Sequence, residues 1–331
     1  MIITLLGDFG LEGFIAQDIL LKAPRARLSL HDETAIVEQF RKKLQKEDAP
    51  ESRLRSRYSR EYRERFDIKA SQVKREQLIK ALGRANVVYL GDYHNIFEPK
   101  RFLVMLARQI LNSGRRIVIG LESVCEEEQE ALDAYLQGEL NDSEFKQEVK
   151  LYRQENGVWF AYDKPIYDFA IRNEIRIVGT DHKGVKFYDR DIRTADLIFR
   201  ELCRTPKAVF FDFSGDLHIA KTHLPQDVKT LAGERNVRDL IIYQNFTDLF
   251  WQFPRTRTIT RLGVSNEYHV TTLDPLSKFV ARYLYNESCE DFEGETGIEA
   301  EQFAARKDYV AVAQKLRNAV AFALTSDPKR V

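Results

Sequence analysis

The clearest structural signal in the chain is the run NVVYLGDYHN at residues 86–95. Its four apolar residues, 87–90, are typical of a short buried strand, and Gly91 ends that strand. A helical pattern follows from Glu98 to Asn112, and residues 116–121 form a second apolar run. A strand, a helix and a second strand in this order predict two parallel strands joined by a crossover helix.

The same alternation continues along the chain. We expect further strands at 175–179, 208–213, 239–243 and 268–273. We expect further helices at 125–137, 163–173 and 191–202, and another that is capped by Asp142 or Ser143. Short, nearly all-apolar strands between helices indicate parallel strands that are covered on both faces. The sequence therefore predicts an α/β fold with a mostly parallel central sheet and helices on both faces.

The chain divides into three parts by composition. Residues 1–85 are rich in charged side chains and predict a charged helical N-terminal extension, broken near Pro50. Residues 86–250 contain the alternating strands and helices of the α/β core. Residues 251–331 predict a C-terminal strand and helix extension that packs on the core and ends in a helical tail at 298–324.

Charge and composition exclude several classes of protein. The 51 basic and 51 acidic residues give a net charge of zero, so no overall field favours nucleic acid or an anionic membrane. No apolar run approaches the ~20 residues that span a membrane, and the start of the chain lacks the basic region and cleavage site of a signal peptide. Three widely spaced cysteines, Cys125, Cys203 and Cys289, argue against a disulfide scaffold or a structural zinc site. We therefore expect a soluble cytoplasmic protein.

Histidines and carboxylates follow several of the predicted strands. They are Asp92 and His94 after the first strand, Glu122 after the second, Asp181 after the third and His218 after the fourth. Ligands of open parallel sheets bind beyond the carboxyl ends of the strands, so these side chains are expected at one edge. Two kinds of chemistry suit them, and their spacing does not decide between the two. Histidine nitrogen and carboxylate oxygen bind zinc, manganese or iron, and a histidine beside a carboxylate is a general acid or base.

Several segments resemble, in their order and spacing, the motifs of ChaN-like proteins. They are VVYLGDYHN (87–95), GLES (120–123), YLQGELNDSEF (135–145), the segments 162–170 and 190–195, and SGDLH (214–218) with Leu224 and Pro225. The resemblance covers about residues 86–243 and extends to a superfamily that includes erythromycin esterases and Tiki-type proteases. It implies an α/β core with paired Gly-x-x-His-type elements and a glutamate around one site. Asp92 stands where the family usually has glutamate, which shortens the reach of that carboxylate.

Some members of this family are haem-binding, iron-related lipoproteins, and others resemble metal-dependent or His/Glu hydrolases. We therefore expect a hydrolase that is either metal-dependent or assisted by histidine and glutamate. Its expected catalytic residues, which either bind a divalent metal ion or activate water, are His94, Glu122 and His218, with Asp92 in support. The expected substrate-binding residues are Arg190, Arg193, Tyr93 and Asp181, since guanidinium groups pair well with carboxylate or phosphate.

Two other interpretations stay open. The first is a protein that binds haem or another iron compound. The resemblance supports it, and so do the aromatic residues near the expected site, which are Tyr93, Trp159, Phe160 and Tyr162. The second is a non-catalytic scaffold or regulatory protein with a relict site, which contacts its partner through the mainly basic segment 41–84. The expected partners are a small-molecule or peptide substrate, or haem, and no nucleic acid. The sequence determines neither the substrate nor the oligomeric state, and an oligomer is compatible with it.

Overall fold

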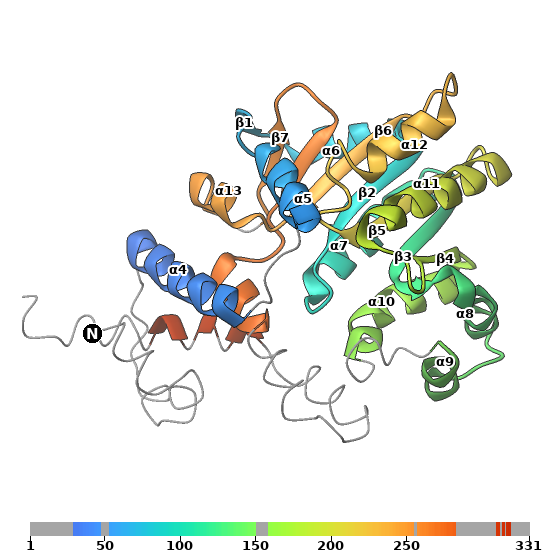
Figure 1. The fold of residues 1–331 in the computed structure, drawn as a ribbon, viewed down its shortest axis with the longest axis horizontal. Coiled ribbons are helices and arrows are strands. Elements are labelled where there is room, and N and C mark those ends of the chain that lie inside the picture. The colour runs from blue at the N-terminus through green and yellow to red at the C-terminus, as the bar shows by residue number, and fades with distance from the viewer. Residues whose placement is uncertain are drawn as a thin grey trace, which may run out of the picture. The chain divides into compact units, whose positions relative to one another are not determined.

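The computed structural model describes residues 29–47, 53–149, 158–254 and 257–282, with short helical pieces between 309 and 318 (Figure 1). The chain forms two compact units. One unit consists of Met1–Ala49, Asp274–Glu293 and Gln302–Val331, and the other consists of Pro50–Leu273 and Gly294–Glu301. The three-part division expected from composition stays a prediction, and the second unit contains the site.

The smaller unit is helical where the structure describes it. It contains α4 (Leu30–Glu47), the helical residues 275–282 and the helical pieces between 309 and 318. Arg317 joins these pieces, because its guanidinium binds Glu33 at 2.6 Å and also contacts Asp274. The N-terminal helices and the helical tail are thus confirmed within the described residues, and most of the expected range 298–324 lies outside them.

An eight-stranded sheet forms the centre of the larger unit, counted over the described residues (Figure 1). Its strands are β1 (Ala70–Gln72), β2 (Val87–Asp92), β3 (Ile117–Cys125), β4 (Arg176–Asp181), β5 (Val209–Gly215), β6 (Asp239–Gln244), β7 (Ile259–Leu262) and β8 (Glu267–Val270). Their order across the sheet is β1-β7-β8-β6-β2-β5-β3-β4. All neighbours from β8 to β4 are parallel, whereas β7 pairs antiparallel with β8 and β1. The predicted mostly parallel sheet is confirmed.

Helices cover both faces of this sheet. One face packs on α6 (Arg75–Arg84), α7 (Phe97–Asn112), α8 (Gln129–Leu136), α9 (Asp142–Glu148) and α10 (Val158–Asn173). The other face packs on α5 (Arg53–Glu64), α11 (Phe187–Arg204) and α12 (Leu224–Ala232), and Leu249 of α13 (Thr247–Gln252) joins the same cluster. Side chains of β2 alternate between the two cores, since Val88 and Leu90 enter the first and Val87 and Tyr89 the second. This two-sided burial explains why the strands are almost wholly apolar.

The backbone of the edge strand β4 is hydrogen-bonded by a side chain in the place where a further strand would pair. Gln129 at the start of α8 accepts from the Gly179 amide at 3.0 Å and donates to the Ile177 carbonyl at 2.9 Å. These bonds satisfy backbone groups that an open edge would leave available for pairing with another chain. The last residue of β3, Cys125, was expected in a helix and instead pairs with the end of β4, because the apolar run extends past Glu122.

Two further expectations are corrected by local chemistry. The cap of α9 is Asn141, one residue before the expected Asp142 or Ser143, since Asn141 Oδ1 accepts from the Ser143 and Glu144 amides at 2.9 and 3.1 Å. The strands β1 and β7 were not expected from the sequence, since they are short and polar or charged residues interrupt them. The break predicted at Pro50 lies outside the described residues. None of the described helices has the length and apolar character that a membrane span requires.

Candidate active site

The carboxyl ends of four neighbouring parallel strands meet at one edge of the sheet. β2, β5, β3 and β4 lie side by side in this order. Asp92 is the last residue of β2, and Asp181 is the last residue of β4. Glu122 lies in β3, where its pairing with β4 shifts in register, and His218 follows β5. A register shift re-aims a side chain, which accounts for a carboxylate that reaches this edge from within a buried strand.

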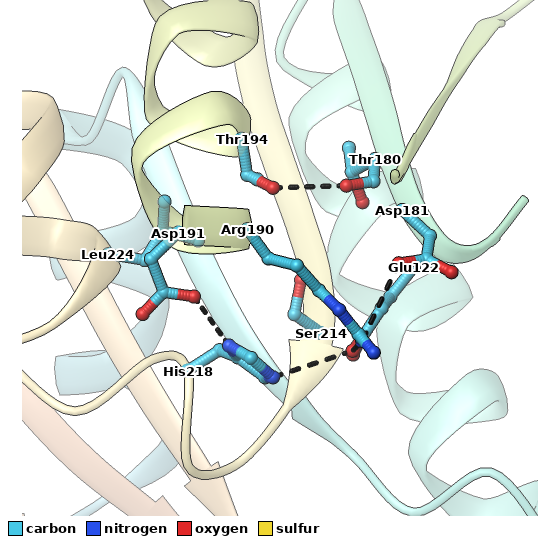
Figure 2. Close-up of a pocket in the computed structure, with 9 residues that line it drawn as sticks. All are labelled: Glu122, Thr180, Asp181, Arg190, Asp191, Thr194, Ser214, His218 and Leu224. Carbon is cyan, nitrogen blue, oxygen red and sulfur yellow. Dashed lines mark hydrogen bonds and ion pairs between the residues drawn. The ribbon is translucent and has the colours of Figure 1, made fainter. Parts of the chain in front are cut away.

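A chain of polar groups runs from Asp191 through His218 to Glu122 (Figure 2). Asp191 Oδ1 lies 2.5 Å from His218 Nδ1, and the other ring nitrogen, Nε2, lies 3.6 Å from Glu122 Oε1. Asp191 comes from α11 and Glu122 from β3, so the imidazole is held between two different elements. A carboxylate at Nδ1 fixes the orientation of a histidine ring, which is an arrangement used in acid–base catalysis.

Glu122 is held by a backbone amide and lies close to a guanidinium. The Gly215 amide donates to Glu122 Oε2 at 2.6 Å. Arg190 Nη1 lies 3.7 Å from Glu122 Oε1 and 3.5 Å from Asp181 Oδ1. Burial alone would raise the pKa of Glu122, but the nearby histidine charges, the Gly215 amide and Arg190 together lower it below its ordinary value of 4.5. Glu122 is therefore a carboxylate at neutral pH.

The charge state of His218 follows from the same neighbours. Burial alone would lower the pKa of His218, but the Glu122 charge and the hydrogen bond to Asp191 raise it from 6.5 to about 9. At neutral pH the pair is thus an imidazolium beside a carboxylate. In this state His218 can give a proton and Glu122 can accept one.

A second histidine–aspartate pair comes from β2. His94 Nδ1 lies 2.7 Å from Asp92 Oδ2, and the Lys100 ammonium lies 2.6 Å from Oδ1 of the same carboxylate. The fully buried Lys100 also donates to the Tyr93 and His94 carbonyls at 2.8 and 3.0 Å. Burial alone would raise the pKa of Asp92, but Lys100 and His94 outweigh it and hold the pKa below the ordinary value. Burial alone would lower the pKa of His94, and its bond to Asp92 raises the pKa instead.

Asp163 of α10 places a further buried acid near this second pair. Burial and the Asp92 charge raise the pKa of Asp163 to about 6, against the opposing charge of Lys100. A hydrogen bond with Ser123 of β3 acts in the other direction. Asp163 is thus an acid whose protonation changes close to neutral pH.

Nine residues line a small pocket of about 10 Å³ at the His218 pair. They are Glu122, Thr180, Asp181, Arg190, Asp191, Thr194, Ser214, His218 and Leu224 (Figure 2). Eight of the nine are polar or charged. This volume is about that needed to hold one water molecule, so the space suits a water or one small polar group of a substrate. The structure therefore brings together four of the residues predicted from the sequence, which are Glu122, His218, Asp181 and Arg190.

Two of the predicted substrate-binding residues lie outside this pocket. The Tyr93 hydroxyl donates to Asp216 at 3.3 Å. Arg193 is exposed and lines a separate surface cavity of about 470 Å³, together with two lysines of the loop before α11. Arg190 and Arg193 therefore do not converge on one group.

The predicted metal ligands, His94, Glu122 and His218, do not form a cluster of the kind that holds a metal ion. Within the described parts of the chain, no group of three or more His, Cys, Asp or Glu side chains is placed to do so. The structure thus gives the predicted metal set no support.

Two important residues were missed by reasoning from the sequence. Asp191 lies in the second turn of α11, among other acidic residues of this helix, so its sequence position alone did not mark it. Lys100 carried a usable signal, because it shares the apolar face of α7 with Leu103 and Ala107 at helical spacing. A lysine on the buried face of a helix needs a buried partner, and here the partner is Asp92.

Comparisons with known proteins agree with the resemblance seen in the sequence. Residues 78–184 match the family model described as haem-binding uptake, Tiki superfamily, ChaN. This match includes His94 and Glu122 and ends before Asp191 and His218. No curated protein matches the chain.

Solved structures with a similar fold come from several proteins. ChaN of Campylobacter jejuni, described with cofacial haem binding, is 14% identical, with a TM-score of 0.42 over 53% of this chain and 88% of that chain. The type III effector HopBA1 is 17% identical, with a TM-score of 0.47 over 62% of this chain and 98% of that chain. RRSP, a MARTX toxin effector domain from Vibrio vulnificus, is 22% identical, with a TM-score of 0.34 over 44% of this chain and 30% of that chain. The predicted resemblance is confirmed by the family match over residues 78–184.

Proposed function

We propose that the protein is a hydrolase whose acid–base pair is Glu122 and His218. The observation that carries this proposal is the chain from Asp191 through His218 to Glu122, set beside Arg190 in one polar pocket. General acid–base catalysis needs an acceptor and a donor within reach of the same substrate atoms. Glu122 and His218 meet that requirement, with opposite charges at neutral pH.

The protonation states assign the roles. Glu122 accepts a proton from a water molecule as the water attacks the substrate, and His218 donates its proton to the leaving group. Asp191 keeps the His218 ring oriented and stabilises its charge. Since Nε2 and the Glu122 carboxylate lie 3.6 Å apart, the proton returns from Glu122 to His218 when the products leave. One turnover thus consumes one water and leaves the pair in its starting state.

Arg190 supplies the fixed positive charge of the site. Its guanidinium lies between Glu122 and Asp181, where it can pair with an anionic group or with the oxyanion that forms during hydrolysis. A metal ion at the same carboxylates would be repelled by this cation. We therefore propose the form of the mechanism in which Arg190, and not a metal ion, balances the carboxylates. Elemental analysis of the wild type beside a His94→Ala/His218→Ala variant tests this form, and stoichiometric metal lost in the variant contradicts it.

A haem-binding protein is the alternative that the family name raises. The pocket does not fit haem, because Leu224 is its one apolar lining residue, whereas a porphyrin requires a largely apolar surface. Phe160 and Tyr162 are buried in the core, where they pack against other rings, and the Trp159 side chain lies outside the described residues. A haem titration that produces a saturable Soret shift, lost on mutation of His94 or His218, would favour this alternative.

A scaffold with a relict site has less support. The exposed arginines of α5 that the structure describes include Arg57 and Arg60, and each pairs with a glutamate four residues further along the same helix. This part of the basic segment is therefore partly neutralised within the helix. The substrate class, a small molecule or a peptide, and a cytoplasmic location stay predictions.

The proposal is tested by a panel of carboxylic ester, peptide and phosphoester substrates. For any substrate that the wild type turns over, Glu122→Gln and His218→Asn should each lower turnover by about 10²-fold or more. Glu201→Gln is the matched control, because Glu201 is also a buried carboxylate that pairs with an arginine, Arg176, at 3.4 Å, away from the pocket. Turnover that survives both site substitutions, or that falls equally in the control, would remove the support for this function.

A further inference from the structure

We propose that Tyr58 and Tyr62 are positioning residues for His218, so that helix α5 is a working part of the site. The catalytic consequence of this inference rests on the proposed function, whereas the positioning itself does not. Helix α5 precedes the segment that the family model matches, and it belongs to the part of the sequence that was expected to be an extension. Its role therefore has to be argued from its own contacts.

Helix α5 turns an aromatic face towards the site. Tyr58 and Tyr62 are four residues apart and are 3% and 7% exposed, and Phe66 continues the same stripe after the helix ends. Figure 1 shows α5 beside α11 and β5, the two elements that supply Asp191 and lead into His218. A helix of 12 residues is marginal by itself in water, so the contacts of this face also stabilise the helix.

The first contact acts on the partner of His218. The Tyr58 hydroxyl donates to Asp191 Oδ2 at 3.1 Å, while Asp191 Oδ1 faces His218 Nδ1 at 2.5 Å. The terminal torsion of an aspartate is broad, so one bound oxygen leaves the carboxylate able to turn. With both oxygens bound, the carboxylate is held in the plane that meets the imidazole. Tyr58 thus positions His218 through Asp191.

The second contact acts on the backbone next to His218. The ring of His223 stacks on the Tyr58 ring with 3.9 Å between centroids and 25° between planes. His223 Nδ1 lies 2.5 Å from the carbonyl of Leu217, and Nε2 lies 2.8 Å from Glu61 of α5. His223 therefore links the helix to the residue that immediately precedes His218.

The third contact acts two residues before His218. The Tyr62 hydroxyl donates to Asp216 Oδ2 at 2.6 Å. Asp216 also packs directly on β2 at Gly91, where a Cβ atom would lie 1.5 Å from Asp216 Oδ1, so that only glycine fits. Positions 216, 217 and the His218 ring are thus each tied, directly or through one partner, to α5. Such support from surrounding groups keeps a catalytic side chain in productive geometry.

The test compares three substitutions that each remove a single buried hydroxyl. Tyr58→Phe keeps the ring that stacks on His223, and Tyr62→Phe keeps the ring of the aromatic face. Tyr135→Phe is the matched control, since Tyr135 is 3% exposed and its hydroxyl also binds a carboxylate, that of Asp142 at 2.7 Å, in another part of the fold. The first readout is the NMR signal of the His218 ring, assigned by its loss in His218→Asn. The second readout is kcat and KM for a substrate found in the panel above.

We expect Tyr58→Phe and Tyr62→Phe to move the His218 ring signals, and Tyr58→Phe to lower kcat by about tenfold with little change in KM. Tyr135→Phe should leave the ring signals and kcat unchanged. The inference is overturned if the His218 signals stay in place in both site variants, or if the control moves them equally. If no substrate is turned over by the wild type, the proposed function fails, and the NMR comparison still decides whether α5 positions His218.

Discussion

His218 and His94 each face an aspartate through Nδ1, but the two pairs are built in different ways. Asp191 comes from another element, α11, and its second oxygen accepts a hydrogen bond from the Tyr58 hydroxyl. Asp92 precedes His94 by two residues, and its second oxygen is bound by the buried ammonium of Lys100. The side chain of His218 is 9% exposed and that of His94 is 30% exposed.

This difference teaches how one type of pair can have two functions. Lys100 already neutralises Asp92, so the aspartate has less charge left to stabilise an imidazolium at His94. The second oxygen of Asp191 accepts a hydrogen bond only from the uncharged Tyr58 hydroxyl. Together with Glu122, Asp191 raises the pKa of His218 to about 9. We infer that the His218 pair carries the proton transfer. The His94 pair mainly stabilises the carboxyl end of β2 and helps to lower the pKa of Glu122.

The largest expected effect separates the two histidines by activity. His218→Asn should lower turnover by about 10²–10⁴-fold, because it removes the acid of the proposed pair. His94→Asn should lower turnover by about tenfold, since it removes only a charge that acts on Glu122 from a distance. Steady-state kinetics on a substrate of the wild type measures both. Equal losses would show that the two pairs share the chemistry, which would break the distinction drawn here.

The next largest effect separates the two pairs by stability. Lys100→Met should lower the free energy of unfolding by about 3–5 kcal/mol, because it leaves the Asp92 charge buried without its main partner. Lys221→Met is the control, since Lys221 is 45% exposed and lies 3.8 Å from Glu267, and it should change stability by less than about 1 kcal/mol. Urea unfolding measures both variants. Adding Asp92→Asn to Lys100→Met should restore part of the loss, and no recovery would argue against an unpaired charge as its cause.

The parts of this site that could be predicted are those that follow an apolar run. His94, Glu122 and His218 come after strands that the apolar pattern indicates, and parallel order places strand ends together. The supports of the two pairs could not be predicted in the same way. Tyr58 and Tyr62 meet Asp191 and Asp216 across 133 and 154 residues of sequence, and such contacts leave no local pattern.

The fold shows the same limit. The core strands were predicted because burial on both faces makes them apolar, whereas β1 and β7 are short and contain polar or charged residues. Their place in the sheet depends on antiparallel pairing with each other and with β8. The hydrophobic pattern therefore identifies strands that are buried along their whole length. It misses short strands whose place in the sheet depends on pairing with distant parts of the chain.

The third prediction concerns pH and tests the raised pKa of His218. The pKa of His218 rises from 6.5 to about 9 on folding, so its contribution to stability is complete below pH 6.5 and is lost as pH rises through 9. At 1.36 kcal/mol per unit, this loss amounts to about 3 kcal/mol. The raised pKa of Asp212, about 7, has its effect below this window. Denaturation curves between pH 7 and 10 should show the fall in the wild type and His94→Asn, and a reduced fall in His218→Asn. A fall of equal size in all three proteins would exclude His218 as its source.

The smallest expected effect concerns the two arginines of α11. Arg190 lines the pocket beside Glu122, whereas Arg193 is exposed in a separate cavity. For an anionic substrate, Arg190→Ala should raise KM by about tenfold, because it removes the cation that pairs with the anionic group. Arg193→Ala should change KM by less than about twofold, since an exposed charge interacts weakly through solvent. A larger effect of Arg193→Ala would mean that the substrate extends from the pocket into the outer cavity.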